Sequence, residues 1–571
     1  MNRLVLLCFV ALSLLAASCS PSSPEFDNTG AELTPTSSTA APSTSSSTTT
    51  TTPDVLAFTD QGPLTLRVSV PRLDFVNPSS VDETDATQVL VTDLLTDGLT
   101  IHDPVSGAVG PGIATSWSSS NDGLTWTFNL GDATFGDGSA ITADDVVWSL
   151  RNVATAGIGS LSGPNLWAVE GWTAAGDIDP DDLPANDNPS ITVESVGIVP
   201  GITAVDDKTV QFTLTERFEP LPDVLAGVAF GVWPSSPPED DELPVSSAID
   251  FSPTSLWADG VRLEAASEVD GEVSTIELFV DPTNSMLEVG ETDLSVAVDP
   301  AEPLGDLRGT TVQRSADAFF AMNSTIAPFD DPMIRQAIVH AVNRDAIRDE
   351  FFPHAGVMQS FIPQQVLGGV PDACGDRCEF DPEQATLLVE ASSSSDVAFT
   401  VDYFSDEVAD EDANAGQAGP EQRLAEALVE QLRVVGLDAT AQAHSTAEFG
   451  AKAARNELGL FRFGSVSTSL TAEADIGAMF HTAGSDNLTG TSIERFDALI
   501  DQARQEPNAD DRADLYQQAE FVLFGEAVVL PLVEFRHHLA HGPTLVGANL
   551  EADGSLDLNS IEFETLEQGT E

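Results

Sequence analysis

The chain has 571 residues, of which 42% are hydrophobic, a composition that is ordinary for a globular protein. Its charge is not ordinary, because 22 lysines and arginines stand against 92 aspartates and glutamates, which gives a formal net charge of −70. A surface this negative repels phosphate groups, which excludes nucleic acid as a partner and anionic lipid headgroups as a docking surface. Solubility in a salty medium, attraction of cationic ligands, or both would account for the excess of acid.

Residues 1–18 have the pattern of a secretory signal peptide. Arg3 gives a basic start, an apolar run broken only by Ser13 extends over residues 4–15, and small residues then lead to Cys19. The apolar run is too short to span a bilayer of about 30 Å as a helix. A cysteine at this place resembles the lipobox of bacterial lipoproteins, in a relaxed form with Ala16 in place of the usual leucine. The resemblance implies that Cys19 carries a lipid anchor at the outer face of the bacterial cell membrane; an ordinary cleaved signal is the alternative.

The next segment, residues 19–61, consists mainly of serine, threonine, proline and alanine. Such a composition cannot bury enough apolar surface to offset the entropy lost on ordering, so we expect a disordered linker. A flexible coil of this length spans roughly 30–40 Å. The remaining residues, 62–571, are too many for one hydrophobic core and indicate roughly two or three lobes.

Alternating and helical patterns predict the elements of the first half of the body. A strand is expected over 64–70, a helix over 87–99, and further strands over 209–214 and 274–280. Asp122-Gly123, between runs at 117–120 and 124–128, is typical of a β-hairpin turn. Thr142 and Asp145 have the spacing of a capping box, with aspartate in place of glutamate, ahead of a helix whose apolar face contains Val146, Val147 and Leu150.

The second half is more helical. Pro332, with Asp331 before it as the cap, opens a helix that continues to about residue 342. A helix from Pro420 to Gly436 precedes a strand over 437–443, and this step is one arm of a βαβ unit, so the sheet is expected to be partly parallel. Further helices are predicted around residues 496–503 and 515–523.

The cysteines and the acidic runs predict one disulfide and no metal-binding loop. Cys374 and Cys378 form an even pair, so a disulfide is favoured in an oxidising compartment, while a metal site there lacks nearby ligands. The run at 177–182 is similar to the start of a calcium loop, but Asp182 and Asn188 stand where glycine and glutamate are required. The acidic runs at 239–242 and 410–412 are interpreted as solvated loops.

Motifs that carry catalytic chemistry are absent from the sequence. The sequence has no zinc-protease motif, no serine-hydrolase motif, no phosphate loop and no dinucleotide-binding glycine pattern. We therefore predict that the protein is not an enzyme and has no cofactor. His537, His538 and His541 form one cluster. On a strand, His537 and His541 could share a face and hold a transition metal with a carboxylate, or they could be ordinary histidines at a strand end.

Five segments occur in one order and cover nearly all of residues 64–571. They resemble the family 5 extracytoplasmic solute-binding proteins, the receptors of peptide- and nickel-type ABC importers. The segments comprise Ala114–Trp117, Asp122–Phe128, Phe135–Gly138, Thr142–Val146 and Ser149-Leu150; Gly290–Leu294; Asn323, Pro328–Asp331, Ile334–Ile338 and Ala341–Ile347; Phe380–Ala385 with Leu387-Leu388; and Phe496–Ile500, Arg512, Leu515-Tyr516 and Pro531-Leu532.

The resemblance implies an α/β fold of the two-lobed periplasmic-binding-protein (venus-flytrap) type II, with an extra domain inserted in the first lobe. We place lobe I at 62–84, 236–298 and 540–571, the inserted domain at 85–235, and lobe II at 299–539. The implied function is capture of a solute in the cleft between the lobes, without turnover, by a monomer that delivers the solute to ABC permease subunits.

The resemblance also suggests the ligand and its contacts. The solute is expected to be an oligopeptide or another amine-bearing organic molecule. Peptide binders place an aspartate, after an aromatic residue, against the ligand's ammonium group, but residues 461–470 contain no aspartate, and Glu473 or Asp475 could substitute. The alternatives are a ligand sensor or surface-interaction protein that has no importer, or a transition-metal binder of the nickel type. The candidate ligand-binding residues are Asn323, Phe463, Ser465, Thr468, Glu473 and Asn487.

Replacing the predicted lipidation site, Cys19→Ala, should release the protein from the membrane, because no later segment has an apolar run of spanning length. The measurement is the distribution of the protein between washed membranes and the soluble fraction of its host. Cys8→Ala is the matched control, since Cys8 leaves with the signal. A Cys19→Ala protein that stays with the membrane would contradict acyl anchoring.

Overall fold

A computed structural model describes residues 63–564, with gaps at 104–106, 157–161, 173–198, 236–246, 248–250, 258, 266–271, 297–304, 395–397, 406–418, 485–486 and 488. The signal, Cys19, the linker, the calcium-like run and both acidic runs lie outside the described residues. All described residues belong to one compact unit of the chain. Within them, no helix has the length and apolar character that a membrane span requires.

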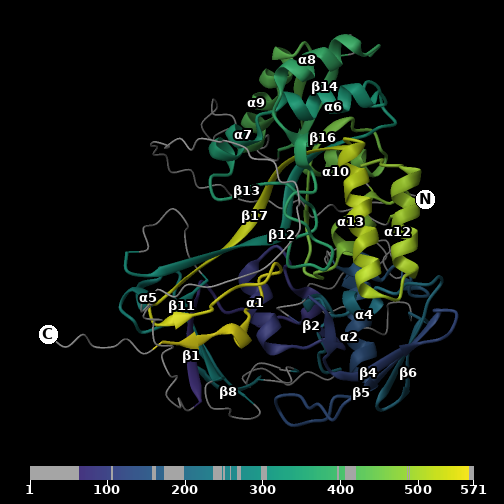
Figure 1. Ribbon diagram of the computed structural model, residues 1–571. Helices are drawn as coiled ribbons and strands as arrows, with labels where there is room; N and C mark the ends of the chain where they lie inside the picture. Colours follow the sequence, from purple (N-terminus) through teal and green to yellow (C-terminus); the bar gives the residue numbers. More distant parts are fainter. Residues whose placement is uncertain are drawn as a thin grey trace, which may run out of the picture. The chain divides into compact units, whose positions relative to one another are not determined.

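Two long strands, β12 (Arg308–Met322) and β17 (Val529–His541), form the centre of an 11-stranded sheet. They pair antiparallel and lie side by side in Figure 1. The strand order is β15-β14-β16-β12-β17-β11-β1-β10-β9-β8, so these two strands connect a set of strands from the first half of the chain to a set from the second. Their ladder is interrupted between Gln313 and Asp317 of β12.

The first set of strands is built around β1, which pairs parallel with β10 and β11. Its core includes Leu66, Val68, Ile276 and Leu278, and α1 adds Leu90. The elements are β1 (Leu64–Val70), α1 (Ala86–Leu95), β8 (Phe251–Trp257), β9 (Gly260–Ala265), β10 (Val273–Val280), α5 (Ser285–Glu288), β11 (Leu294-Ser295), β18 (Leu545-Val546) and β19 (Glu562-Phe563).

A four-stranded sheet, β4-β5-β7-β6, lies between β1 and β8 in the sequence and has a separate core around Phe128 and Phe212. The predicted hairpin is confirmed: β4 and β5 pair antiparallel, and Gly123 has a φ of +71° in the turn. The elements are β2 (Thr100–His102), β3 (Val109–Pro111), β4 (Ala114–Ser119), β5 (Thr125–Leu130), α2 (Ala143–Ala156), β6 (Ile202–Asp206), β7 (Thr209–Thr213) and α4 (Leu221–Val224).

The predicted capping box at the start of α2 is confirmed in one half: the Asp145 side chain accepts from the Thr142 N–H, but the Thr142 hydroxyl donates to Asp145 instead of accepting from its backbone N–H. The carboxylate of Asp145 accepts hydrogen bonds from the Thr142 backbone N–H at 3.0 Å and from its hydroxyl at 2.7 Å. Its other oxygen accepts from the backbone and side chain of Ser235. One short aspartate therefore holds both the helix start and a distant segment, which keeps the pKa of Asp145 below its ordinary value despite burial.

The second half of the chain has the largest core, which contains Phe319, Phe361, Phe463 and Phe480. The predicted parallel step is confirmed, because β14 pairs parallel with β15 after the α9 crossover. The elements are α6 (Pro332–Ala341), α7 (Arg344–Phe351), β13 (Gly356-Val357), α8 (Pro382–Ala391), β14 (Phe399–Phe404), α9 (Pro420–Val434), β15 (Ala439–His444), α10 (Thr446–Ala454), β16 (Leu460–Val466), α11 (Ala478–Phe480), α12 (Glu494–Gln505) and α13 (Ala509–Gly525).

The two-lobed α/β fold expected from the sequence is confirmed, whereas the exact domain boundaries remain a prediction. One element limit was wrong, because α1 ends at Leu95 rather than near Leu99. There the backbone approaches another segment closely: a Cβ on Gly98 would lie 2.6 Å from the Leu225 carbonyl oxygen. Cys374 and Cys378 lie together, with Cα atoms 5.7 Å apart, and the disulfide between them stays a prediction.

Phe319→Ala should lower the free energy of unfolding of the second-half core by about 3–5 kcal/mol, the usual result of a large cavity in a packed core. Phe319 is fully buried, and its ring centroid lies 5.3 Å from that of Phe361 and 5.5 Å from that of Phe463. Urea unfolding followed by circular dichroism measures the change. Phe380→Ala, at a phenylalanine that is 45% exposed, is the control and should change stability by less than about 0.5 kcal/mol. Equal losses in the two variants would contradict this packing.

Candidate ligand-binding site

β16 and the segment that follows it contribute four of the six predicted residues. β16 carries Phe463 and Ser465, the next stretch carries Thr468, and Glu473 begins η8 (Glu473–Gly477), a single helical turn of the π type. Leu470, between them, has a positive φ of 42°, a conformation that is uncommon for a residue other than glycine. The chain therefore turns sharply here, and the polar groups after β16 face several different elements.

Glu473 is fully buried and is neutralised within the chain. Its Oε1 accepts hydrogen bonds from Nη2 and Nε of Arg504, at 2.6 and 3.0 Å, and its Oε2 accepts from the Tyr516 hydroxyl at 2.8 Å. The guanidinium of Arg504 also lies over the Trp167 ring, 4.6 Å from its centroid. Although burial alone would lower the pKa of Arg504, the charge of Glu473 raises it overall. Both Glu473 oxygens thus have partners in the chain.

Thr468 belongs to a buried hydrogen-bonded cluster that joins distant parts of the chain. Its hydroxyl donates to Oε2 of Glu83 at 2.6 Å and lies 3.1 Å from the Ser162 hydroxyl. The backbone N–H of Ser162 donates to Oε1 of Glu83 at 3.0 Å, and its hydroxyl also bonds to that carboxylate. Ser469 and Asn165 make a further side-chain contact at 3.4 Å. The segment after β16 is therefore tied both to the residues before α1 and to those after α2.

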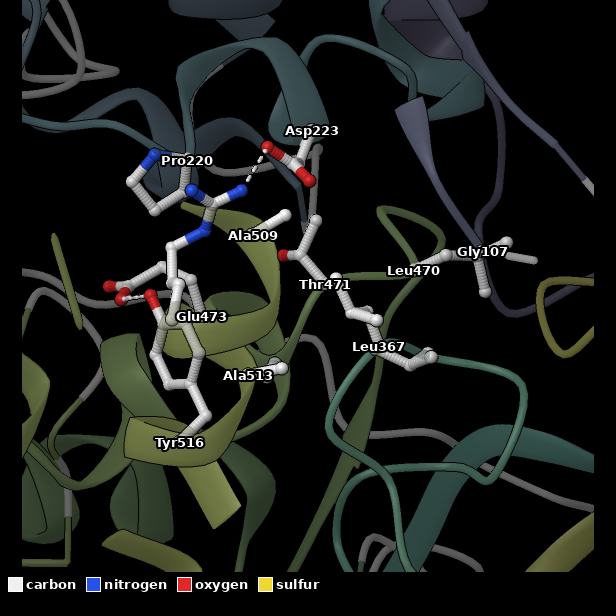
Figure 2. Close-up of a pocket in the computed structure, with 13 residues that line it drawn as sticks. Gly107, Pro220, Asp223, Leu367, Leu470, Thr471, Glu473, Ala509, Ala513 and Tyr516 are labelled. Atoms are coloured by element: carbon white, nitrogen blue, oxygen red, sulfur yellow. Dashed lines mark hydrogen bonds and ion pairs between the residues drawn. The ribbon is translucent and has the colours of Figure 1, made fainter. Parts of the chain in front are cut away.

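A second contact between the two halves of the chain lies at the wall of a small cavity. Nη2 of Arg512, on α13, donates to Oδ2 of Asp223, on α4, at 3.1 Å. Burial raises the pKa of Asp223, and the charge of Arg512 offsets part of that effect. Figure 2 shows Pro220 and Asp223 on one side of the cavity, and Glu473, Ala513 and Tyr516 on the other.

The cavity has a volume of ≈ 20 Å³, which is about the room that one water molecule needs. A peptide or another organic solute therefore does not fit while the elements around it stay as they are. The lining residues come from both sequence halves: Gly107, Pro220, Asp223, Val366, Leu367, Leu470, Thr471, Ala472, Glu473, Ala509, Arg512, Ala513 and Tyr516. Of the six predicted residues, Glu473 lines this cavity.

Phe463 and Ser465 lie on β16, and neither lines the cavity. Phe463 is 9% exposed and packs edge-on against Phe319 in the aromatic core. Ser465 is paired with Asp317 of β12; burial raises the pKa of that carboxyl, and a hydrogen bond from the Ser465 side chain offsets part of the rise. Their roles as ligand contacts stay a prediction.

The side chains of Asn323 and Asn487, the two asparagines among the predicted residues, stabilise loops by hydrogen bonds. The Asn323 side chain is fully buried; its Oδ1 accepts from the backbone N–H of Thr325 at 3.0 Å, and its Nδ2 donates to the Asn456 carbonyl at 3.3 Å. Nδ2 of Asn487 donates to the carbonyls of His481 and Thr491, at 3.1 and 2.7 Å. Both amides fix turns, and neither lines the cavity.

The histidine cluster lies on β17, as the sequence suggested, with His537 and His541 each 6% exposed. Burial lowers the pKa of His537 to about 3, so it is neutral at physiological pH. Nδ1 of His541 lies 3.0 Å from the Gly542 carbonyl oxygen. Among the residues that the structure describes, no group of three or more His, Cys, Asp or Glu side chains could hold a metal ion. The transition-metal alternative has no site in that part of the chain.

Sequence reasoning missed the charged partners of the candidate residues. Arg504, Arg512 and Asp223 lie in stretches that read as ordinary amphipathic helix or loop, and nothing local indicates which group each would meet. Asp317 had a usable signal, because it stands inside the apolar run of β12 at residues 316–322. Charged residues are rarely placed in a buried strand without a partner.

Comparisons with known proteins agree with this architecture. Residues 108–249 and 276–487 match the family described as bacterial extracellular solute-binding proteins, family 5 Middle. The chain is 24% identical over 460 residues to the dipeptide-binding protein of Escherichia coli K12, covering 74% of this chain and 80% of that one. It is 23% identical over 467 residues to heme-binding protein A of Haemophilus influenzae, covering 74% and 78%.

A solved structure supports the same fold. HbpA2 from Haemophilus parasuis superimposes with a TM-score of 0.67 at 19% identity, covering 88% of this chain and all of that one. The strand arrangement and this likeness define a two-lobed α/β fold of the binding-protein type. The chain belongs to family 5 of the bacterial extracellular solute-binding proteins.

Glu473→Gln should lower the free energy of unfolding by about 3–5 kcal/mol, because it leaves the buried Arg504 guanidinium without a counter-charge. Glutamine has nearly the same shape, so the loss reports charge rather than packing. Urea unfolding measures the effect, and Glu457→Gln, at an exposed carboxylate paired with Arg455, is the control and should leave stability unchanged. A Glu473→Gln protein as stable as the control would contradict the assigned role of this ion pair.

Proposed function

We propose that this protein captures an extracytoplasmic solute, an oligopeptide or another amine-bearing organic molecule, between its lobes and delivers it to the permease of an ABC importer. Its family and its relatives support the proposal, since proteins named for dipeptide and heme binding are among them. The observation that carries it is the set of polar contacts that hold distant parts of the chain together around a water-sized cavity.

Those contacts have the strength expected of a reversible closure. Thr468 bonds to Glu83, and Arg512 bonds to Asp223; each contact joins the second half of the chain to the first. A hydrogen bond contributes only about 0.5–1.5 kcal/mol net, and about 1.5–3 kcal/mol when it involves a charged group. A few of them can therefore hold a closed form without preventing opening. A solute shifts this equilibrium if it binds the closed form more tightly than the open one.

The two long central strands, β12 and β17, supply a mechanism for that motion. β12 and β17 connect the two sets of strands, and β12 leaves its pairing with β17 between Gln313 and Asp317. A short stretch that is freed from the ladder can change its backbone angles without breaking the sheets on either side. Hinges of this kind absorb a domain rotation in a few residues.

We further propose that Cys19 tethers the body to the outer face of the membrane and that the protein acts as a monomer without turnover. The linker of residues 19–61 would let the body move roughly 30–40 Å from its anchor. That reach suits a receptor that collects a solute from its surroundings and then meets a permease in the same membrane.

The test is to purify the protein from its own host, identify co-purifying solutes by native mass spectrometry, and rebind them after the protein has been refolded without solute. We expect an amine-bearing organic molecule, and its rebinding should shrink the radius of gyration measured by small-angle scattering. The refolded protein without solute is the control. If nothing co-purifies and no peptide pool changes the scattering curve, the binding proposal is wrong.

A further inference from the structure

A short segment of the second half of the chain, residues 467–471, is buried against residues of the first half; we call it the junction segment. Thr468 and Ser469 within it are 1% and 0% exposed. The Thr468 hydroxyl bonds to Glu83 and lies beside that of Ser162, as described above, and the Ser469 hydroxyl donates to that of Ser162 at 3.2 Å. The junction segment therefore contacts two separate regions of the first half.

Both ends of the junction segment are fixed within the second half. The backbone N–H of Ser467 donates to the Ser315 carbonyl of β12 at 2.8 Å. At the other end, the Thr471 hydroxyl accepts from the backbone N–H of Ala474 at 3.1 Å. Between these ends, Leu470 has the positive φ noted above, a strained conformation that persists where surrounding contacts impose it. The contacts of the junction segment thus determine its shape.

Gly227, between α4 and η5 (Val228–Phe230), lets the first half approach the junction segment closely. A Cβ at Gly227 would lie 3.1 Å from Oγ of Ser469, 3.2 Å from its Cα and 3.3 Å from the Thr468 carbonyl oxygen. The backbone of Gly227, with φ −68° and ψ 144°, is one that any residue adopts. The missing side chain therefore serves the contact with the junction segment and not a turn.

The first-half partners of the junction segment are themselves held in place. Nη2 of Arg314 donates to the backbone carbonyls of Glu83 and Thr84, at 3.1 and 2.8 Å. Nε1 of Trp172, which belongs to the core of the four-stranded sheet, donates at 2.8 Å to the carbonyl of Gly163, where η2 (Gly163–Leu166) begins. The junction segment is therefore received by a surface that other contacts have already ordered.

The junction segment leaves no room for a solute where it lies. Leu470 and Thr471 line the cavity of ≈ 20 Å³ that is drawn in Figure 2. A site for an organic ligand usually has a volume of about 300 Å³ or more. The chain's own side chains thus fill the space between the halves at this place, and a solute can enter it only when they withdraw.

We propose that the junction segment is an autoinhibitory contact: it fastens the two halves together on the chain's own side chains and must leave Glu83, Ser162 and Gly227 before a solute binds. The inference rests on the proposed function and adds to it a step in which the solute displaces part of the receptor. Such a contact lowers the apparent affinity, because only the fraction of molecules in which it is broken can bind. A solute is retained only if its own contacts outweigh those of the junction segment.

The first experiment needs no solute and uses small-angle scattering of protein that has been refolded without solute. Gly227→Val puts a side chain against the junction segment, and Thr468→Val removes a hydroxyl at nearly constant shape, so each should increase the radius of gyration. Gly110→Val is the matched control and should scatter as the wild type does, because the nearest atom to a Cβ there is the Ile101 carbonyl oxygen, at an ordinary 3.9 Å. Thermal unfolding verifies that each variant is folded.

A reversible lock tests the same contact without weakening it. Ser162→Cys combined with Thr468→Cys places two thiols where hydroxyls lie 3.1 Å apart, so oxidation should join them. Isothermal titration calorimetry then measures binding of an equimolar pool of tripeptides before and after reduction. We expect the locked protein to bind at least about tenfold more weakly than the reduced one, and Gly227→Val to bind more tightly than the wild type. Wild-type protein in the same reductant controls for effects at Cys374 and Cys378.

The outcomes separate the two proposals. If the folded valine variants scatter as the wild type does, or if the lock does not form, the autoinhibitory contact is wrong and solute binding stands. If the locked and reduced proteins bind the pool equally, the contact inhibits nothing and the inference is wrong. If a valine variant does not fold, the lock alone decides. If the wild type and the reduced protein bind no pool and no solute co-purifies, solute binding is wrong, and inhibition is wrong with it.

Discussion

The pairing of β12 with β17 is the constraint on which the rest of the described structure depends. Within one 11-stranded sheet, these two strands connect the set of strands around β1 to the set that contains β14 and β16. The pairing joins residues more than 200 positions apart and changes register at two places, between Gln313 and Asp317 and between Ala318 and Phe319. Because the two sets of strands are joined through β12 and β17, any change in their relative orientation must be absorbed by these two strands. The elements around the cavity, α13 and the segment after β16, are positioned by the same strands.

Buried charge is distributed around that connection in two different ways. Glu473 with Arg504, and Asp223 with Arg512, are compensated pairs, and forming them costs the desolvation of four ions. Asp317 and Asp475 are not compensated by any described basic residue. Uncompensated buried carboxylates lower the stability of a fold and persist where the structure around them enforces their position. Their location at the interrupted strand pair, rather than in a uniform sheet, is consistent with a functional reason for keeping them.

The sequence predicts what is local and misses what is distant. The Asp122-Gly123 turn and the Thr142–Asp145 capping box were predictable, because a few neighbouring residues determine the hydrogen bonds that they form. The family resemblance supplied the two-lobed fold. Neither route could pair Glu473 with Arg504 or Glu83 with Thr468, since those contacts depend on how separate elements pack. Four of the six candidate residues lie on β16 and the segment that follows it, whereas Asn323 and Asn487 are engaged in turns of their own.

The net charge of −70 and the buried carboxylates act over different distances. In a salty medium the field of surface carboxylates is screened within about 8–10 Å, so it raises the local concentration of cations but does not select among them. Selection requires carboxylates that water cannot reach, where a neutral ligand leaves acceptors unpaired and a cation does not. An acidic surface would thus accelerate the arrival of any amine, whereas groups buried in the binding site would decide which one is retained.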